Sequence, residues 1–157
     1  MNRSLRPLLG ILPLVAALAG CGRPFILATP PGFVDMGTRY GDSEYRAATA
    51  DGVVIGVRAF DNDPKGELPF WARTLELRMR DAGGYALLDK RDVTARGGLT
   101  GVAMRFGHDE AKTPYLYTAA LFVTDKKIYL VEAGGTKAEV MKQEAQIDWA
   151  IKNLAPK

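Results

Sequence analysis

Hydrophobic and polar residues alternate along 45–60 in the way that paired β-strands require. Two runs with this alternation, 45–49 and 53–60, flank Ala50-Asp51-Gly52. An Asp-Gly step between β-favouring runs is typical of a tight turn, so we predict a β-hairpin here. The second run places one set of side chains on one face (Val53, Ile55, Val57 and Ala59) and another set on the opposite face (Val54, Arg58 and Phe60).

The period of the pattern then lengthens from two residues to about four. Residues 61–66 are rich in turn formers, and Pro69 follows at a position that the first turn of a helix tolerates. An apolar stripe recurs at every fourth residue, at Trp71, Leu75 and Met79. Gly83-Gly84 comes next, and glycine commonly ends helices. We predict an amphipathic helix from Pro69 to about Gly83 that packs on a sheet.

Five further runs favour β-strands, at 85–88, 93–95, 99–106, 115–124 and 128–133. Polar or glycine-containing links separate them, at 89–92, 97–98, 107–114 and 125–127. Strands joined by tight turns pair in antiparallel fashion. We therefore expect an antiparallel meander.

The chain closes with a second amphipathic pattern. Thr136 and Glu139 have the spacing of a capping box, in which each residue's side chain bonds the other's backbone N–H. Apolar residues then recur at near-helical spacing, at Val140, Ile147, Ile151 and Leu154. We predict one helix from Thr136 to about Asn153. The element order argues for a single α+β domain over 33–157, an antiparallel sheet with two packed α-helices, and not for a Rossmann-type fold.

A different pattern opens the chain. Arg3 and Arg6 precede an apolar run over 8–18, and small residues follow it, as in a secretory signal peptide. The run is too short, and too broken by proline and glycine, to span a bilayer as a helix. Its last residues, Leu18-Ala19-Gly20-Cys21, resemble the lipobox of bacterial lipoproteins. The alternatives are an ordinary signal peptide with an incidental Cys21, or an N-terminal helix lying along the membrane.

The lipoprotein resemblance implies a specific processing of the chain. Residues 1–20 would be a signal peptide, and Cys21 would carry a diacylglyceryl group on its sulfur and acylation on its new amino terminus. Several acyl chains together hold a protein on a membrane. Residues 21–32 would form a lipidated, proline-rich tether. Gly22 is not the aspartate that often signals inner-membrane retention, so the resemblance implies the outer membrane, facing the periplasm.

The charge and cysteine content limit the kinds of partner and chemistry that the chain can have. The formal net charge of +3 includes Arg3 and Arg6, so most of it would leave with the signal peptide. The remaining bases are interleaved with acids, which argues against a nucleic-acid surface. Cys21 is the only cysteine, so no intramolecular disulfide can form. Lipidation would also remove this thiol from catalysis and metal binding.

Few residues offer catalytic chemistry. Ser43 lacks the Gly-x-Ser-x-Gly setting of a hydrolase nucleophile. His108 is the only histidine, and His108-Asp109-Glu110 could form a base or a weak cation site. A solvated turn is the preferred interpretation, because neighbours in a loop do not converge on a ligand without a geometry imposed by the fold. The acids Asp61, Asp63 and Glu67 could bind Ca²⁺ but lack the spacing of an EF-hand. The sequence predicts no metal site, no cofactor and no catalytic residue.

Two further motifs have both a functional and a structural interpretation. The run 134–137, Gly-Gly-Thr-Lys at a helix start, could hold an anion, but it is not a Walker loop and helix capping explains it. A group of aromatic residues could line a groove or a partner surface, or simply belong to the core: Phe70, Trp71, Tyr115 and Tyr117.

The layout of these motifs resembles a known family. Pro31-Gly32-Phe33, the hairpin, the Pro69-Phe70-Trp71 helix, the Gly97 to Gly101 strand start and the strand with Tyr115 and Tyr117 together look like the PsbP/DcrB-like group. That resemblance implies binding and accessory roles, and it supplies no functional residues. The leading hypothesis is a non-catalytic, lipid-anchored periplasmic protein that binds an envelope protein partner. The alternatives are an enzyme whose site forms only in the fold, or a small-ligand carrier.

Overall fold

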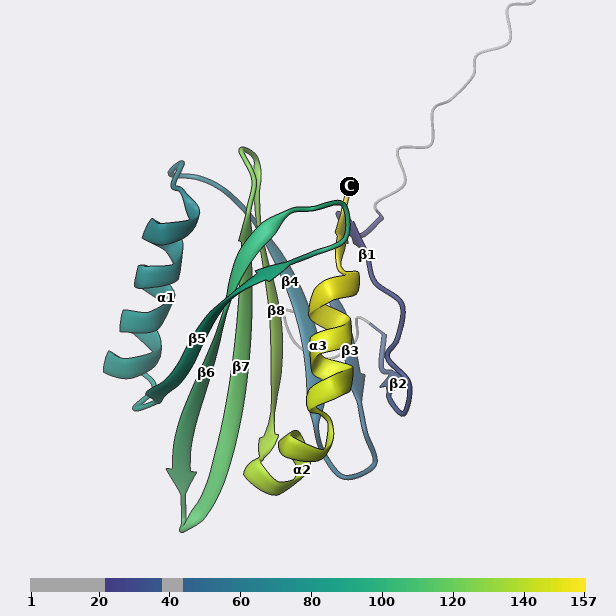
Figure 1. Ribbon diagram of the computed structural model, residues 1–157, viewed down its shortest axis with the longest axis vertical. Helices are drawn as coiled ribbons and strands as arrows, with labels where there is room; N and C mark the ends of the chain where they lie inside the picture. Colours follow the sequence, from purple (N-terminus) through teal and green to yellow (C-terminus); the bar gives the residue numbers. More distant parts are fainter. Residues whose placement is uncertain (1–21, 38–43) are drawn as a thin grey trace, which may run out of the picture.

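The computed structural model describes residues 22–37 and 44–157, and a seven-stranded antiparallel sheet is its central feature (Figure 1). The strand order is β2-β3-β4-β8-β7-β6-β5. The strands are β2 (Val34–Asp35), β3 (Tyr45–Ala48), β4 (Val54–Asp61), β5 (Ala86–Thr94), β6 (Thr100–Glu110), β7 (Thr113–Val123) and β8 (Lys127–Thr136). A separate two-stranded sheet joins β1 (Phe25–Ile26) to β9 (Ala155–Pro156). The predicted α+β class is confirmed.

The predicted hairpin is formed by β3 and β4. Their residues pair from Tyr45 with Val57 to Ala48 with Val54, and Gly52 takes the positive φ of +88° that the turn requires. Val53, Ile55 and Val57 are fully buried, as the alternation predicts. Arg58 and Phe60 lie on the opposite face of the sheet, where they line a groove described below.

The meander from β5 to β8 differs from its prediction at two places. Residues 89–92 are not a link, because β5 is one strand paired with β6 along its length, apart from a register shift between Leu87 and Asp89. It is an edge strand, so its polar residues are tolerated. The predicted loop over 107–114 shrinks to a two-residue turn. Ala111 and Lys112 both have positive φ there, as a type I′ hairpin turn requires.

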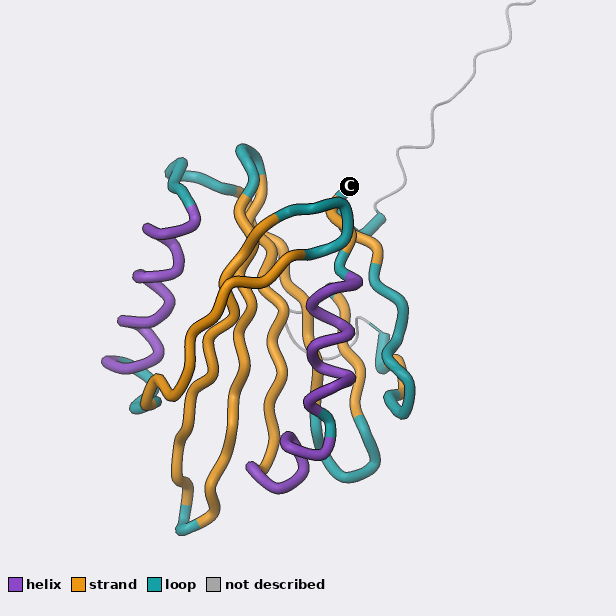
Figure 2. Tube along the Cα trace, in the orientation of Figure 1, coloured by secondary structure: helices purple, strands orange, loops and turns teal. Residues whose placement is uncertain are grey.

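Helices cover both faces of the sheet (Figure 2). On one face α1 (Leu68–Asp81) contacts β5, β6 and β7 over a core that includes Met104, Phe106 and Leu121. On the other face α3 (Glu144–Asn153) covers the larger core, which includes Tyr45, Phe122 and Ile151. Among the residues that the structure describes, no helix has both the length and the apolarity needed to cross a membrane.

The closing helix is two helices instead of one. α2 (Lys137–Lys142) ends at Gln143, whose φ of −104° and ψ of 12° interrupt the helix before α3 begins. The break lets α2 pack on β7 and β8 while α3 packs on β5 and β8. Thr136 is the residue that precedes α2, as predicted, but its side chain makes no capping hydrogen bond. The predicted capping box is therefore wrong.

Most of the predicted tether is packed against the domain. Phe25 is only 2% exposed and belongs to the larger core, so Phe33 is not the first core-facing residue, as the sequence pattern had indicated. β1 pairs with β9, and the Pro24 carbonyl accepts hydrogen bonds from the Lys157 amide and from the Tyr129 hydroxyl. Prolines remove backbone donors but leave carbonyls free to accept, which is how Pro24 takes part.

Candidate functional site

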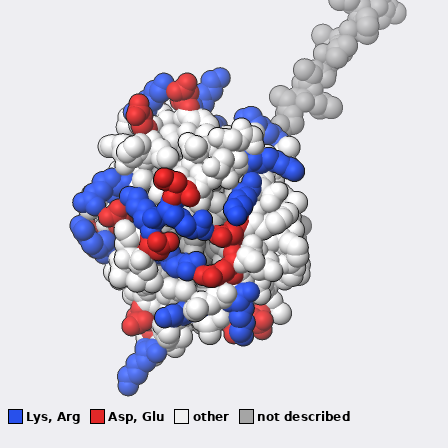
Figure 3. Space-filling model, in the orientation of Figure 1, with Lys and Arg blue, Asp and Glu red and all other residues white. Residues whose placement is uncertain are grey.

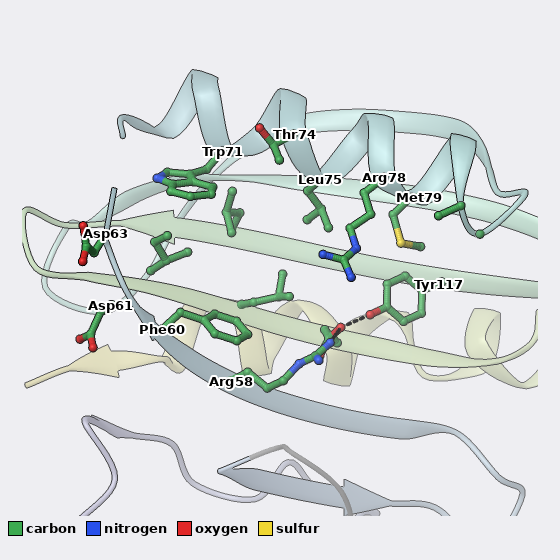
Figure 4. A pocket seen from close by; sticks show the side chains of 16 residues that line it. Arg58, Phe60, Asp61, Asp63, Trp71, Thr74, Leu75, Arg78, Met79 and Tyr117 are labelled. Atoms are coloured by element: carbon green, nitrogen blue, oxygen red, sulfur yellow. Dashed lines mark hydrogen bonds and ion pairs between the residues drawn. The ribbon is translucent and has the colours of Figure 1, made fainter. Parts of the chain in front are cut away.

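An open groove lies between α1 and the sheet (Figure 4). α1 sits over β5, β6 and β7, and no described helix covers β4 and β8 on this face. The space left beside α1 has a volume of about 810 Å³. That volume falls within the range of small-molecule binding sites, about 300–1,000 Å³.

Most of the groove's surface is apolar. The helix contributes one wall, with Trp71, Leu75 and Met79, which are the stripe predicted from the sequence. The sheet contributes a floor of Leu121, Ile128 and Leu130. Phe60 of β4 forms part of the far wall and is 46% exposed. An apolar surface of this kind gains free energy when another apolar group removes it from water.

A buried asparagine fixes the first turn of α1. The Asn62 side-chain amide donates to the carbonyls of Gly66 and Thr124, and its oxygen accepts from the Gly66 amide and from Trp71 Nε1, all at 2.9 Å. Gly66 is needed for this approach, because a Cβ there would lie 2.6 Å from Trp71 Nε1. The groove wall is therefore held in place by a fully used polar side chain.

A polar cluster lies at the opposite end of the groove. Arg58 Nε donates to Glu132 Oε2 at 2.6 Å, a second Arg58 nitrogen donates to Glu132 Oε1, and the Tyr117 hydroxyl donates to the same oxygen. The strand register brings them together diagonally, because Gly56 lies opposite Glu132 and Gly134 lies opposite Tyr117. Gly134 leaves space for the Tyr117 ring, which a Cβ at that position would approach to 3.3 Å.

The surroundings of Tyr117 and Arg58 in this cluster raise the pKa of both groups. Burial, followed by the charge of Glu132, raises the pKa of Tyr117, so its phenol stays neutral. The hydrogen bond to Glu132 raises the pKa of Arg58, so its guanidinium stays charged. The Glu132 side chain is 13% exposed and accepts hydrogen bonds from both. The three side chains therefore form a hydrogen-bonded unit in which both donors point to Glu132.

The structure brings only some of the aromatic candidates together. Trp71 and Tyr117 both line the groove. Phe70 packs edge-on against Trp71 with ring centroids 5.0 Å apart, but its own side chain is 56% exposed. Tyr115 lies elsewhere, in a smaller cleft with His108. Trp71 and Tyr117 therefore line the groove and also pack against the core beneath α1.

The acidic and histidine candidates do not assemble into a site. His108 stacks on Tyr85 at 5.0 Å, and its Nδ1 lies 3.3 Å from the Gly84 carbonyl, while Asp109 and Glu110 are exposed. Asp61 forms an ion pair with Lys127 at 2.8 Å. Within residues 22–37 and 44–157, no three His, Cys, Asp or Glu side chains are grouped closely enough to hold a metal ion.

The Gly-Gly-Thr-Lys run has a structural role. Gly134 and Gly135 belong to β8, and a Cβ on Gly134 would come 3.3 Å from the Tyr117 ring. The run therefore accommodates a groove residue and is not a loop for an anion. Cys21, the predicted lipidation site, and Ser43 lie outside the described residues.

The sequence did not reveal Arg58 and Glu132 as a pair, since they are 74 residues apart. The sequence did contain one indication that Glu132 has a partner. Glu132 is the only charged residue in the apolar run 128–133, and an acid inside a buried strand needs a partner. The face of β4 that carries Arg58 was predicted correctly, but the identity of its partner depends on strand order.

The charges on the surface are mixed. Figure 3 shows basic and acidic side chains interspersed over the face it displays. Several charged residues of the described chain form half-exposed ion pairs, such as Arg91 with Asp148 at 2.5 Å and Arg105 with Glu144 at 2.7 Å. Pairs of this kind contribute little to stability. On this face no single sign of charge dominates.

Comparison with known proteins shows the fold. No protein-family model matches the chain, and no curated protein does so either. LpqN, involved in cell envelope biogenesis of Mycobacterium tuberculosis, has a TM-score of 0.64 at 14% identity over 88% of each chain. PsbP from the cyanobacterium Synechocystis has a TM-score of 0.55 at 9% identity, over 91% of this chain and 99% of that one. The predicted likeness to the PsbP fold is confirmed.

A third solved structure has the same fold. A Pseudomonas aeruginosa protein of unknown function, PA94, matches with a TM-score of 0.53 at 14% identity over 88% of each chain. Identities this low support the arrangement of elements and carry no residue roles from one chain to another.

Proposed function

We propose that this chain is a lipid-anchored, non-catalytic accessory protein of the bacterial cell envelope, and that it binds its partner through the groove beside α1. The observation that carries the binding role is the groove itself, which has apolar walls and floor and a polar cluster whose members are all paired. A catalytic site would need at least one acid, base or nucleophile able to change state.

The anchoring part of the proposal rests on the sequence. Residues 1–21 resemble a lipoprotein signal, and the proposed location is the outer membrane, facing the periplasm. The fold is compatible with such a role, because LpqN, a protein of cell envelope biogenesis, has the same arrangement of elements. The proposed partner is another envelope component, and no nucleic acid is involved.

The groove also bears on the two alternatives. An enzyme would be supported by a buried carboxylate in a pocket near His108 or Tyr45. Asp109 beside His108 is exposed. Beside Tyr45, Glu44 has one buried carboxylate oxygen, but Glu44 lines none of the described pockets. The partly buried carboxylate of Glu132 is instead neutralised by Arg58. A small-ligand carrier needs apolar space between sheet and helix, and the groove supplies it. Carriage of a small ligand is therefore the favoured form of the binding role.

The anchor is tested by expressing the full chain and its Cys21→Ala variant in a Gram-negative host. We expect wild type in the outer-membrane fraction, with an acyl mass on a mature chain that begins at Cys21. The variant should appear in the soluble fraction or remain as unprocessed precursor. A wild-type chain without acyl mass would refute the anchor.

The binding site is tested in the same cells with a photoreactive amino acid at Leu75, in the groove, and a matched one at Ala145, which is exposed on α3. We expect crosslinked adducts from the groove position only. Equal crosslinking from both positions would refute the groove as the binding site.

A further inference from the structure

The apolar face of α1 is incompletely covered. Ala72 is its only buried residue, whereas the shorter α3 buries Ile147, Ala150 and Ile151. Trp71, Leu75 and Met79 keep part of their surface open to the groove. A helix stabilised by packing is expected to cover such a stripe. The groove therefore has the surface of a site that an apolar group can fill.

The width of the groove restricts what can enter. Arg58 and Phe60 rise from β4 and close the side opposite α1, so the floor is formed by β7 and β8 alone. Neighbouring strands are about 4.8 Å apart, which puts β4 about 10 Å from β7. A helix with its side chains is about 10–12 Å wide, and α1 already overlies β7. A partner helix is therefore too wide for this floor, whereas a single extended chain fits.

The chemistry of the floor distinguishes between a peptide and an alkyl chain. β8 pairs with β4 on one side and with β7 on the other, so its backbone groups are already used in the sheet. A peptide lying on this floor would bury its own N–H and C=O groups without backbone partners, which costs free energy. An alkyl chain has no such groups, so the floor favours it.

Charge is separated along the groove. Figure 4 shows Asp61 and Asp63 near the Trp71 end, and Arg78 reaching from α1 toward the sheet at the Tyr117 end. Arg58 is neutralised by Glu132, and Asp61 by Lys127. Among the described residues, Arg78 forms no ion pair. Its guanidinium is thus available to a carboxylate, which it binds in bidentate fashion.

We propose that the groove binds a fatty acid, with the alkyl chain over Leu130 and Ile128 and the carboxylate on Arg78. This inference rests on the proposed function, in that it specifies the occupant of the same groove. It does not depend on the lipid anchor.

The two tryptophans of the chain make a direct test possible. Trp71 lines the groove, and Trp149 lies on α3, on the opposite face of the sheet. In the full chain with Cys21→Ala, which carries no acyl group of its own, Trp149→Phe leaves Trp71 as the only reporter. Titration with bromododecanoate should quench its fluorescence to saturation, because bromine quenches on contact. The matched Trp71→Phe chain, which reports from Trp149, should show no saturable quenching.

The role of Arg78 is tested in the same assay. We expect Arg78→Gln to weaken bromododecanoate binding about tenfold, the equivalent of one charge-assisted hydrogen bond, and to leave bromododecanol binding unchanged. Arg78→Glu should shift the preference to bromododecylammonium. Arg80→Gln is the control, because Arg80 pairs with Asp81 and does not line the groove.

Three results would overturn the proposal. Trp71 fluorescence that bromododecanoate does not quench would exclude the fatty acid, and crosslinking from Leu75 to a protein would then identify a protein occupant instead. Equal affinity for all three head groups would remove the role of Arg78. Equal quenching of Trp71 and Trp149 would indicate non-specific association with the amphiphile.

Discussion

At the scale of residues, the Arg58, Glu132 and Tyr117 cluster shows how a sheet can carry a carboxylate on a largely apolar face. Removing Glu132 from water costs free energy, which three hydrogen bonds from Arg58 and Tyr117 and the positive charge of Arg58 offset. The Arg58 side chain is about a third exposed, so solvent screens part of its attraction to Glu132.

Tyr117 makes alkaline stability a test of this cluster. Its pKa is raised in the folded protein, whereas an unfolded tyrosine ionises near pH 10. The stability contributed by the neutral phenol is therefore complete below about pH 10 and is lost as pH rises above it. We expect Tyr117→Phe to be about 1 kcal/mol less stable than wild type at about pH 8. At about pH 11 wild type should have lost about 1.4 kcal/mol of this contribution, which is enough to make Tyr117→Phe slightly the more stable of the two.

Urea unfolding of wild type and of Tyr117→Phe, each at about pH 8 and about pH 11, checks this prediction. Tyr45 and Tyr129 also have raised pKa values and lower the alkaline stability of both chains, so only the difference between the chains is diagnostic. A difference that stays constant with pH would show that the Tyr117 phenol is not held neutral by the fold.

The sequence could predict the faces of these residues but not their partners. Alternation along 53–60 placed Arg58 opposite the core, as observed. Its contact with Glu132 requires β4 and β8 to be neighbours, although the segments between them contain a helix and three strands. Local patterns carry no information about such long-range pairing, since it is decided by which faces bury one another.

At the scale of elements, the accuracy of the prediction followed the strength of the local signal. The Asp-Gly turn and the Trp71, Leu75 and Met79 stripe have distinct signatures, and both elements formed. The turn at Ala111 and Lys112 lacks the usual Asn-Gly or Asp-Gly signal, so it read as a longer loop. The break at Gln143 has no local signal, because the packing of α2 and α3 on different strands determines it.

β1 is the element for which the sequence pattern gave the least indication. Its packing leads to a testable prediction. Phe25 lies between prolines in a segment that composition marked as extended, yet it is 2% exposed within the larger core. We expect Phe25→Ala to cost about 3–5 kcal/mol of unfolding free energy, because it leaves a cavity the size of a phenyl ring.

The neighbouring residue supplies the control. Ile26 is 58% exposed, so Ile26→Ala should change the unfolding free energy by less than about 0.5 kcal/mol. Chemical denaturation of both variants measures the contrast. Two variants of equal, near-native stability would mean that β1 is not docked in solution and that the segment is the free tether suggested by its composition.

At the scale of the whole molecule, docking of β1 shortens the connection between the proposed anchor and the domain. Pro24 is held by Tyr129 and by the Lys157 amide, so only Gly22 and Arg23 separate it from Cys21. Three residue steps span at most about 10 Å. Under the proposed lipid anchor, this end of the domain therefore lies against the membrane surface and not at the end of a long leash.

The loops at this end of the domain predict how the domain is oriented relative to the membrane. Lys126, in the turn between β7 and β8, lies close to Pro24, and Lys65 in the loop before α1 pairs with Asp125 of that turn at 3.1 Å. The turn between β6 and β7, which contains Lys112, lies at the opposite end of the molecule (Figure 1). The Trp71 end of the groove is thus the end nearer the membrane.

Depth measurements on the lipidated protein test this orientation. A fluorophore on Lys126→Cys should be quenched by brominated lipids in vesicles, and one on Lys112→Cys should not. The two positions flank opposite ends of the 11-residue strand β7, and each residue of a strand adds about 3.4 Å, so the Lys112 label is far from the membrane. Inserting about ten flexible Gly and Ser residues between Gly22 and Arg23 should weaken quenching at Lys126, since such a linker lets the domain move away from the surface. Equal quenching at both positions before the insertion would show that the docked β1 segment does not orient the domain. The proposed anchor would still stand, because the acyl mass on Cys21 tests it separately.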